Sequence, residues 1–180
     1  KEQFLAFQRS CCPTCGACQY MGTAATMQVM AEALGLALPW SALIPATHAE
    51  IRRMARAAGR QVLELAGKGI TPRKILTKEA FENAIVVHAA VGGSLNAVMH
   101  LIAIAREAGI RLEPELFDRI HRRVPVLVDT KTAGRYPTEL FWYAGGVPMV
   151  MRELRDDLHL DCLTVTGKTV GENLERFAKD

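Results

Sequence analysis

The feature that most constrains this chain is a run of four cysteines within eight residues: Cys11, Cys12, Cys15 and Cys18. Neighbours this close cannot pair easily as intrachain disulfides, because a relaxed bridge needs a particular separation of the two Cα atoms. The fifth cysteine, Cys162, stands alone far downstream. We therefore expect a reducing, cytoplasmic setting in which the thiolates bind metal or react, rather than a secreted disulfide scaffold.

Composition narrows the class of protein. With 180 residues, 49% of them hydrophobic, the chain is long enough for one sizeable globular domain, and no linker divides residues 1–180. The net charge of +3 comes without a basic run, and aromatic residues make up only 6%. This pattern disfavours nucleic acid as a partner. No apolar stretch reaches the ~18 residues of a membrane span, so no membrane partner is expected.

Helical periodicity dominates the sequence. Apolar residues recur at helical spacing in segments that begin at capping residues and end at glycine. These segments predict helices over 23–34, 47–66, 77–91, 95–108, 114–122, 137–143 and 147–154, and a terminal helix from 169. Two short β-branched runs, 124–128 and 163–165, predict strands. The expected fold class is a helix-rich α/β domain, with helices covering a sheet.

Four of the predicted helix starts carry a specific capping signal. Thr47 with Glu50, and Thr169 with Glu172, have the spacing of a capping box, in which two side chains satisfy free N–H groups reciprocally. Thr77 and Ser94 are single candidate caps for the helices that follow them.

The chemistry of the cysteine run is open from the residues alone. Cys12, Cys15 and Cys18 have the spacing of the first three ligands of a ferredoxin cluster, but the fourth cysteine is absent. Half of a zinc site is another interpretation, although no second Cys/His pair follows at zinc-finger spacing, and His48 and His88 are isolated. The third interpretation is structural, namely that one or two of these small cysteines simply pack under a helix.

Several segments, in the same order along the chain, resemble the IlvD/Edd dehydratase family. The first is Cys-Pro-Thr-Cys-Gly-Ala-Cys-x-x-Met-Gly-Thr-Ala-x-Thr-Met, which begins at Cys12. The others are 80–84, Gly92-Gly93-Ser94-Leu95-Asn96 with His100, 144–148 and 163–169. Together they span essentially the whole chain, which makes the resemblance far more specific than any one segment.

The resemblance implies a hydro-lyase. Such an enzyme removes water from a 2,3-dihydroxy acid, either a sugar acid such as an aldonate or another dihydroxy acid, and gives a 2-keto acid. It implies an iron–sulfur cluster, 2Fe–2S rather than 4Fe–4S, and Mg²⁺. A metal makes the C3 hydroxyl a better leaving group while a base takes the C2 proton. A small-molecule hydroxy acid and further copies of the chain, in a homo-oligomer, are the implied partners.

Only one cluster ligand of the family matches a cysteine here. It is the cysteine before x-x-Met-Gly-Thr-Ala, which is Cys18, so the resemblance implies that Cys11, Cys12 and Cys15 are not ligands. The family's other cysteine ligands, its magnesium ligands and its serine base have no counterpart. We therefore expect no catalytic residue within residues 1–180. We expect the chain to be an inactive fragment that comes from the N-terminal domain of a longer enzyme and does not include its C-terminal domain.

The resemblance also places part of the substrate pocket. Thr23, with Gly22, would shape the wall beside the cluster, and Ser94 and Asn96 would line the pocket. Leu95 stands where the family commonly has threonine. The residues after Cys18 are closer to the sugar-acid branch than to the branched-chain amino acid branch. The alternative function is a zinc- or cluster-binding module built on the Cys12-x-x-Cys15-x-x-Cys18 spacing, without catalysis.

Overall fold

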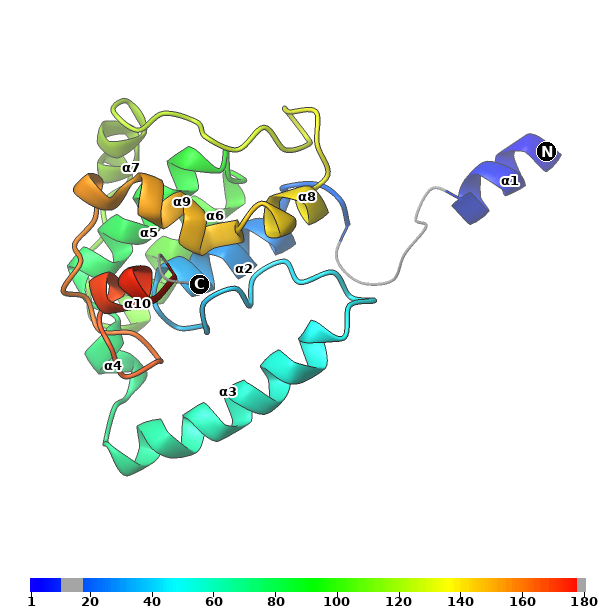
Figure 1. Ribbon diagram of the computed structural model, residues 1–180. Helices are drawn as coiled ribbons and strands as arrows, with labels where there is room; N and C mark the ends of the chain where they lie inside the picture. The colour runs from blue at the N-terminus through cyan, green and yellow to red at the C-terminus, as the bar shows by residue number, and fades with distance from the viewer. Residues whose placement is uncertain (11–17, 178–180) are drawn as a thin grey trace.

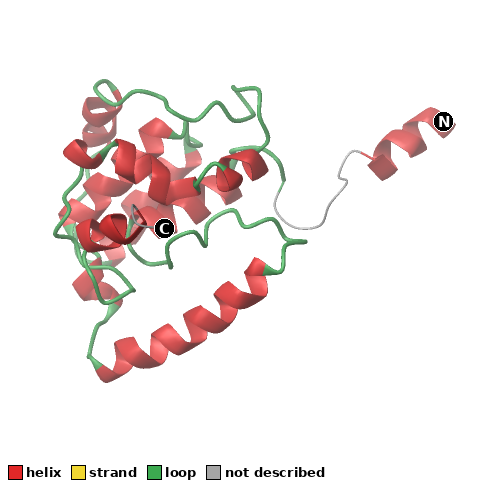
Figure 2. Ribbon diagram, in the orientation of Figure 1, coloured by secondary structure: helices red, strands yellow, loops and turns green. Residues whose placement is uncertain are grey.

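The computed structural model describes residues 1–10 and 18–177, and helices make up most of these residues (Figures 1 and 2). The helices are α1 (Glu2–Ser10), α2 (Thr23–Ala33), α3 (Glu50–Gly67), α4 (Pro72–Ile75), α5 (Lys78–Ala90), α6 (Asn96–Glu107), α7 (Pro114–His121), α8 (Thr138–Tyr143), α9 (Gly146–Glu153), the 3₁₀ turn η1 (Arg155–Asp157) and α10 (Val170–Phe177). The helix-rich prediction is therefore confirmed.

Helix α5 is the centre of the fold. From Ala80 to Ala90 its side chains are buried on every side of the helix, with Glu82 the exception. Phe81 and Ile85 are 0% exposed. A helix that is apolar all round must lie inside other helices, and α5 contacts α2, α7 and α9.

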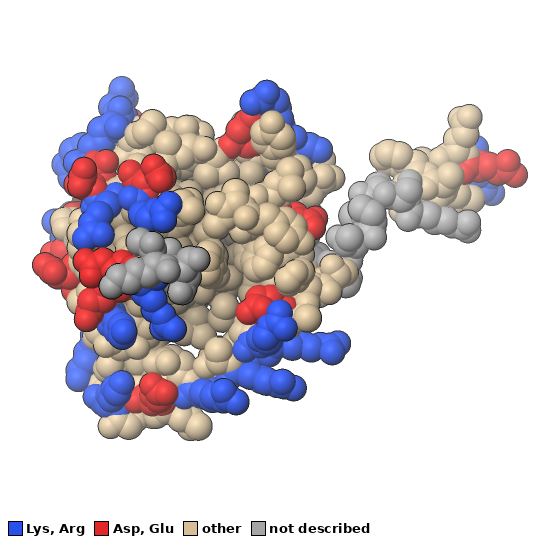
Figure 3. Space-filling view, in the orientation of Figure 1, with Lys and Arg blue, Asp and Glu red and all other residues tan. Residues whose placement is uncertain are grey.

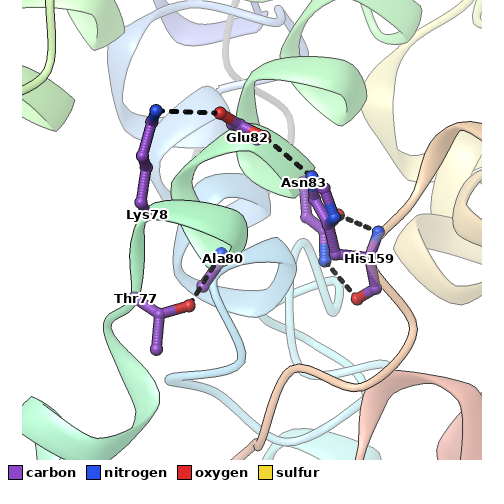
Figure 4. A network of polar contacts seen from close by, with 6 residues as sticks. All are labelled: Thr77, Lys78, Ala80, Glu82, Asn83 and His159. Carbon is purple, nitrogen blue, oxygen red and sulfur yellow. Dashed lines mark hydrogen bonds and ion pairs between the residues drawn. The ribbon is translucent and has the colours of Figure 1, made fainter.

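A buried amide ties α5 to the chain that follows η1. Asn83 is 0% exposed. Its Nδ2 donates to the backbone oxygen of His159 at 3.0 Å, and the His159 N–H donates to Asn83 Oδ1 at 2.7 Å (Figure 4). The ring of His159 also contacts Glu82, with 2.7 Å between Nε2 and Oε2. Both ends of the amide are thus paired, as a buried polar group requires.

A second buried polar group, Glu32 of α2, organises the connection from α2 to α3. Its carboxylate accepts the N–H groups of Trp40, at 2.7 Å, and Ala42, at 2.9 Å. Burial raises the pKa of Glu32 to about 7, although these backbone amides act in the opposite direction. Trp40 in turn donates from its ring Nε1 to the Gly145 oxygen at 2.6 Å, which links this connection to the start of α9.

Helix α3 stands apart from the packed helices (Figure 1). None of its residues is buried, and Val62 and Leu63 are 58% and 73% exposed. A cavity of 320 Å³ lies between its inner side, at Met54 and Ala58, and segment 36–41. Basic side chains gather over α3 in Figure 3, and the helix contains the exposed Arg52, Arg53, Arg56 and Arg60.

The two predicted strands are wrong, and α/β character is not confirmed in the part of the chain that the structure describes. Residues 124–128 form no ladder, because the N–H groups of Leu127 and Val128 both donate to a single carbonyl, that of Ala90. Of 163–165, Leu163 makes only an isolated bridge with Thr169. A β-branched run becomes a strand only where another strand offers its backbone groups, and none does so within 18–177.

Candidate functional site

The N-termini of α2 and α6 bring together the three residues predicted to bind substrate. Asn96 Nδ2 donates to Thr23 Oγ1 at 2.6 Å, and Thr23 Oγ1 lies 3.5 Å from Ser94 Oγ. The Asn96 N–H also donates to Ser94 Oγ at 3.4 Å. Helix α2 has no side-chain cap, since Gly22 occupies its N-cap position, whereas Ser94 Oγ takes the first N–H of α6. The structure thus places this cluster beside the uncapped start of α2.

Buried groups hold the Ser94 peptide from both sides. The Ser94 N–H donates to Thr26 Oγ1 at 3.0 Å, and Thr26 is 0% exposed. The Ser94 oxygen accepts from the Ala97 N–H at 2.9 Å and lies 3.0 Å from His88 Nε2. Ser94 is therefore anchored through its backbone, while its hydroxyl faces Thr23.

Two glycines allow the loop before α6 to approach these buried groups. Gly92 has a φ of +60°, a backbone conformation that favours glycine. At Gly93 a Cβ would lie 2.6 Å from Cδ2 of His88 and 3.0 Å from the methyl group of Thr26. The Gly-Gly-Ser sequence is needed here because only glycine lets the backbone lie this close to α2 and α5.

Cys18 lies on the segment that leads into α2. It is an exposed free thiol, and its Sγ lies 3.9 Å from the oxygen of Tyr20. The segment is held by the start of α8 and the chain before it: the Thr138 N–H donates to the Gln19 oxygen at 3.0 Å, and the Met21 N–H donates to the Lys131 oxygen at 2.6 Å. Cys18 is thus an accessible thiol on a segment whose backbone is fixed, which suits a metal ligand.

The thiol of Cys18 fits one ligand position of an iron–sulfur cluster, but a cluster needs more thiolates than this. No group of three or more His, Cys, Asp or Glu side chains within the described residues could hold a metal ion. Cys162 is buried, and burial raises the pKa of its thiol, which disfavours a thiolate. Cys11, Cys12 and Cys15 lie outside the described residues.

The cluster of Thr23, Ser94 and Asn96 is uncharged and rich in hydrogen-bonding groups. Because Thr23 Oγ1 accepts from Asn96, its own hydrogen is available to a second acceptor. Ser94 adds another hydroxyl. The uncapped N-terminus of α2 favours an anion, and a carboxylate is the anion of an organic acid. The arrangement suits a small hydroxylated acid better than an apolar or cationic ligand.

Comparison with known proteins identifies the family. A family model described as the N-terminal part of dihydroxy-acid/6-phosphogluconate dehydratase matches residues 1–173. The chain belongs to this family. Proteins named dihydroxy-acid dehydratase from Caldanaerobacter subterraneus subsp. tengcongensis, Acidothermus cellulolyticus and Mycobacterium ulcerans are 49%, 54% and 53% identical to it over 97%, 97% and 96% of its length. The dehydratase family predicted from the sequence motifs is thereby confirmed.

The match covers only part of each relative. The aligned region makes up 32%, 32% and 31% of those three proteins, so the chain spans about a third of their length. The family members are named as dehydratases, which are hydro-lyases.

Among the residues that the structure describes, no helix is both long and apolar enough to cross a membrane.

Sequence reasoning missed the residues that support the site. His88 was predicted to be isolated, yet its Nδ1 lies 3.1 Å from Nε2 of His121, and the two rings stack. Thr26 carried a usable signal, since it lies one helical turn after Thr23 and so shares its face of α2. No sequence pattern links His88 with His121, because α5 and α7 meet only through tertiary packing.

Proposed function

We propose that this chain is part of a hydro-lyase that removes water from a 2,3-dihydroxy acid and releases a 2-keto acid. The observation that carries the proposal is the convergence of Thr23, Ser94 and Asn96 at the starts of α2 and α6. Two hydroxyls and an amide can bind the hydroxyl groups of the substrate, while the uncapped N-terminus of α2 favours its carboxylate. The relatives that carry the name dihydroxy-acid dehydratase support the same reaction.

Cys18 would supply one thiolate to an iron–sulfur cluster, with 2Fe–2S favoured over 4Fe–4S. When bound, the cluster supplies a Lewis acid beside the hydroxyl that leaves. The remaining cluster ligands, the Mg²⁺ ligands and the base that takes the C2 proton would come from outside residues 1–180. The role of Thr23, Ser94 and Asn96 is to bind and orient the substrate.

We further propose that residues 1–180 act as a single N-terminal domain of a polypeptide as long as the relatives. Segments outside these residues would then supply the strands of an α/β domain. The protein would be a cytoplasmic homo-oligomer that binds a small hydroxy acid. Both a sugar acid, which the residues after Cys18 favour, and a shorter dihydroxy acid, which the relatives' names favour, carry the required carboxylate and diol.

The test is a graft. Residues 1–173 would replace the matching segment of the Acidothermus cellulolyticus protein, and formation of 2-keto acid would be measured with 2,3-dihydroxy-3-methylbutanoate and with D-gluconate. We expect turnover by the graft, and loss of both turnover and cluster absorbance in the Cys18→Ser variant. Cys162→Ala is the matched control, because this buried cysteine is not a ligand in the proposal. A folded graft whose Cys18→Ser variant keeps its iron and its activity would refute the proposal.

The same cysteines allow a direct test of the metal-binding alternative. The 180-residue chain alone would be titrated with Zn²⁺, and reconstituted with iron and sulfide, as the wild type and as single Cys12→Ser, Cys15→Ser and Cys18→Ser variants. The dehydratase proposal expects Cys12 and Cys15 to be dispensable. Tight binding by the chain alone, with equal dependence on all three cysteines, would favour the stand-alone module.

A further inference from the structure

A pair of stacked histidines lies beneath the loop that carries Ser94. His88 of α5 is 3% exposed, and its ring stacks on that of His121 of α7 with centroids 5.0 Å apart and an angle of 13° between the planes. Nδ1 of His88 lies 3.1 Å from Nε2 of His121, and Nε2 of His88 lies 3.0 Å from the Ser94 oxygen. A continuous line of polar contacts therefore runs from α7 through α5 to the substrate loop.

The Ser94 carbonyl determines where the protons of this pair lie. A carbonyl oxygen can only accept, so Nε2 of His88 must carry a hydrogen. Neutral His88 then has its lone pair on Nδ1, and Nε2 of His121 must donate to it. Each ring is therefore required in the tautomer that is protonated on Nε2.

The surroundings of the pair favour its neutral form. Burial lowers the pKa of His88, although the bond to Ser94 acts in the opposite direction. Burial also lowers the pKa of His121, and the neighbouring His88 lowers it further, whereas Asp118 raises it. While Nε2 of His121 carries its hydrogen, a second proton on Nδ1 of His88 would face that N–H, so this tautomer of His121 is compatible only with neutral His88.

The loop offers few other ways to orient Ser94. Its N–H is held by Thr26 and its carbonyl by His88 and Ala97. Gly93 is packed directly against the His88 ring. The His88 ring, donating from Nε2, thus acts together with Thr26 and Ala97 to direct the Ser94 hydroxyl toward Thr23.

We propose that His88 is a positioning residue for the substrate site, and that His121 holds it in the tautomer that donates to Ser94. The proposal rests on the proposed role of Ser94 in binding the hydroxy acid. His88 acts through the Ser94 carbonyl and does not touch the substrate. Loss of its donated hydrogen bond would leave the Ser94 peptide held by Thr26 and Ala97 alone and would weaken substrate binding by about tenfold, the effect of one neutral hydrogen bond.

The first experiment needs no enzymatic activity. In the 180-residue chain, ¹⁵N NMR of the histidine rings at pH 7 should show His88 protonated on Nε2 and bare on Nδ1. The His121→Phe variant keeps a stacked ring but removes the donor, and it should give His88 a mixture of tautomers. A His88 that is protonated on Nδ1 in the wild-type chain would overturn the proposal.

The second experiment separates positioning from packing. The His88→Gln variant places an amide N–H near the position of Nε2, whereas His88→Leu fills the site without a donor. Hydrogen exchange of the Ser94 amide should become about tenfold faster in His88→Leu, and close to wild type in His88→Gln. If both substitutions changed the exchange rate of the Ser94 amide equally, His88 would contribute only packing, and the proposal would be overturned.

The third experiment adds the substrate. In the graft, His88→Leu should raise KM by about tenfold with a smaller change in kcat, and His88→Gln should recover most of the loss. A wild-type graft that folds without turnover would refute the proposed dehydratase function, while the tautomer and the Ser94 exchange rates would still decide the role of His88.

Discussion

At the scale of single residues, Gly93 has the least room for a side chain among the groups that build the site. A methyl group there would meet the His88 ring at 2.6 and 2.7 Å and the Thr26 methyl at 3.0 Å. We expect Gly93→Ala to lower the free energy of unfolding by about 1–3 kcal/mol, the usual cost of overpacking. The exposed Gly59 of α3 has no atom within 4 Å of its Cβ position, so Gly59→Ala should raise stability by up to ~1 kcal/mol. Urea denaturation measures the free energy of unfolding of both variants. Equal stability of Gly93→Ala and wild type would contradict the close packing of Gly93 against His88 and Thr26.

Asn83 tests the buried amide network of Figure 4. In Asn83→Asp a carboxylate would face the His159 oxygen, which now accepts from Nδ2 at 3.0 Å. We expect a loss of about 3 kcal/mol in the free energy of unfolding, because a buried acceptor is left unpaired and a charge is buried. Glu82→Gln, in the same network but at a partly exposed ion pair, should cost less than ~1 kcal/mol. Thermal or urea unfolding that ranks the two variants equally would contradict this account.

At this scale, the sequence predicted only those site residues that belong to sequence motifs. Thr23, Ser94 and Asn96 were predicted separately, from segments far apart in sequence, and the structure brings their polar atoms within 3.5 Å of one another. Their roles in binding substrate remain predictions. Thr26 and His88 act through backbone groups of the loop. The helical spacing from Thr23 indicated Thr26, whereas no pattern in the sequence indicated the contact of His88 with Ser94.

At the scale of elements, Glu32, which holds the connection between α2 and α3, makes the free energy of unfolding depend on pH. Its pKa is raised from 4.5 to about 7 by burial, so the folded chain binds a proton more tightly than the unfolded chain does. The stability contributed by that proton is present below pH 4.5 and is lost as pH rises to about 7, with a total near 3 kcal/mol for this shift. Urea denaturation from pH 4 to 8 should show the loss in wild type, and Glu32→Gln should remove it.

The control for this prediction is a carboxylate whose pKa moves in the opposite direction. The pKa of Glu79, near the start of α5, is lowered by its own backbone N–H and by the Thr77 hydroxyl. Its contribution is therefore present above pH 4.5 and is lost only in more acidic solution. Glu79→Gln should therefore leave the change in the free energy of unfolding between pH 4.5 and 7 as it is in wild type. If Glu32→Gln showed the same change with pH as wild type in this interval, the role of Glu32 would be refuted.

Helix starts were predictable where the cap is local. Thr77 Oγ1 accepts from the Ala80 N–H, and the Thr169–Glu172 box forms with bonds of 2.8 and 3.2 Å, as the sequence predicted. The Thr47–Glu50 box is wrong, because α3 begins at Glu50 and its N-cap, Ala49, has no side-chain cap. Ser94 precedes the N-cap position of α6, yet its Oγ accepts the first N–H of the helix, that of Asn96, at 3.4 Å, so its predicted capping role is confirmed in part. Tertiary contacts with Thr26 and His88 hold its backbone as well.

At the scale of the whole molecule, helix content was predictable and the sheet was not. Helical periodicity is carried within a segment, so α2, α5, α6 and α9 lie within one or two residues of their predicted bounds. A strand depends on a partner, and residues 124–128 meet only one carbonyl of α5. Val126 and Leu127 consequently remain 68% and 44% exposed. The sequence therefore predicted the local structure of this segment better than its role in the fold.

The position of α3 leads to the last prediction. Apolar residues recur at helical spacing along 47–66, but none of the 18 residues of α3 is buried and a cavity lies beneath it. Amide protection follows burial and contact density, so α3 should exchange its amide hydrogens much faster than α5, which should open only on global unfolding. Hydrogen exchange with mass spectrometry measures both. In Leu63→Glu, an exposed apolar side chain is replaced without loss of packing, so the exchange of α3 should not change. Protection of α3 equal to that of α5, lost in Leu63→Glu, would show instead that the helix packs against another copy in solution.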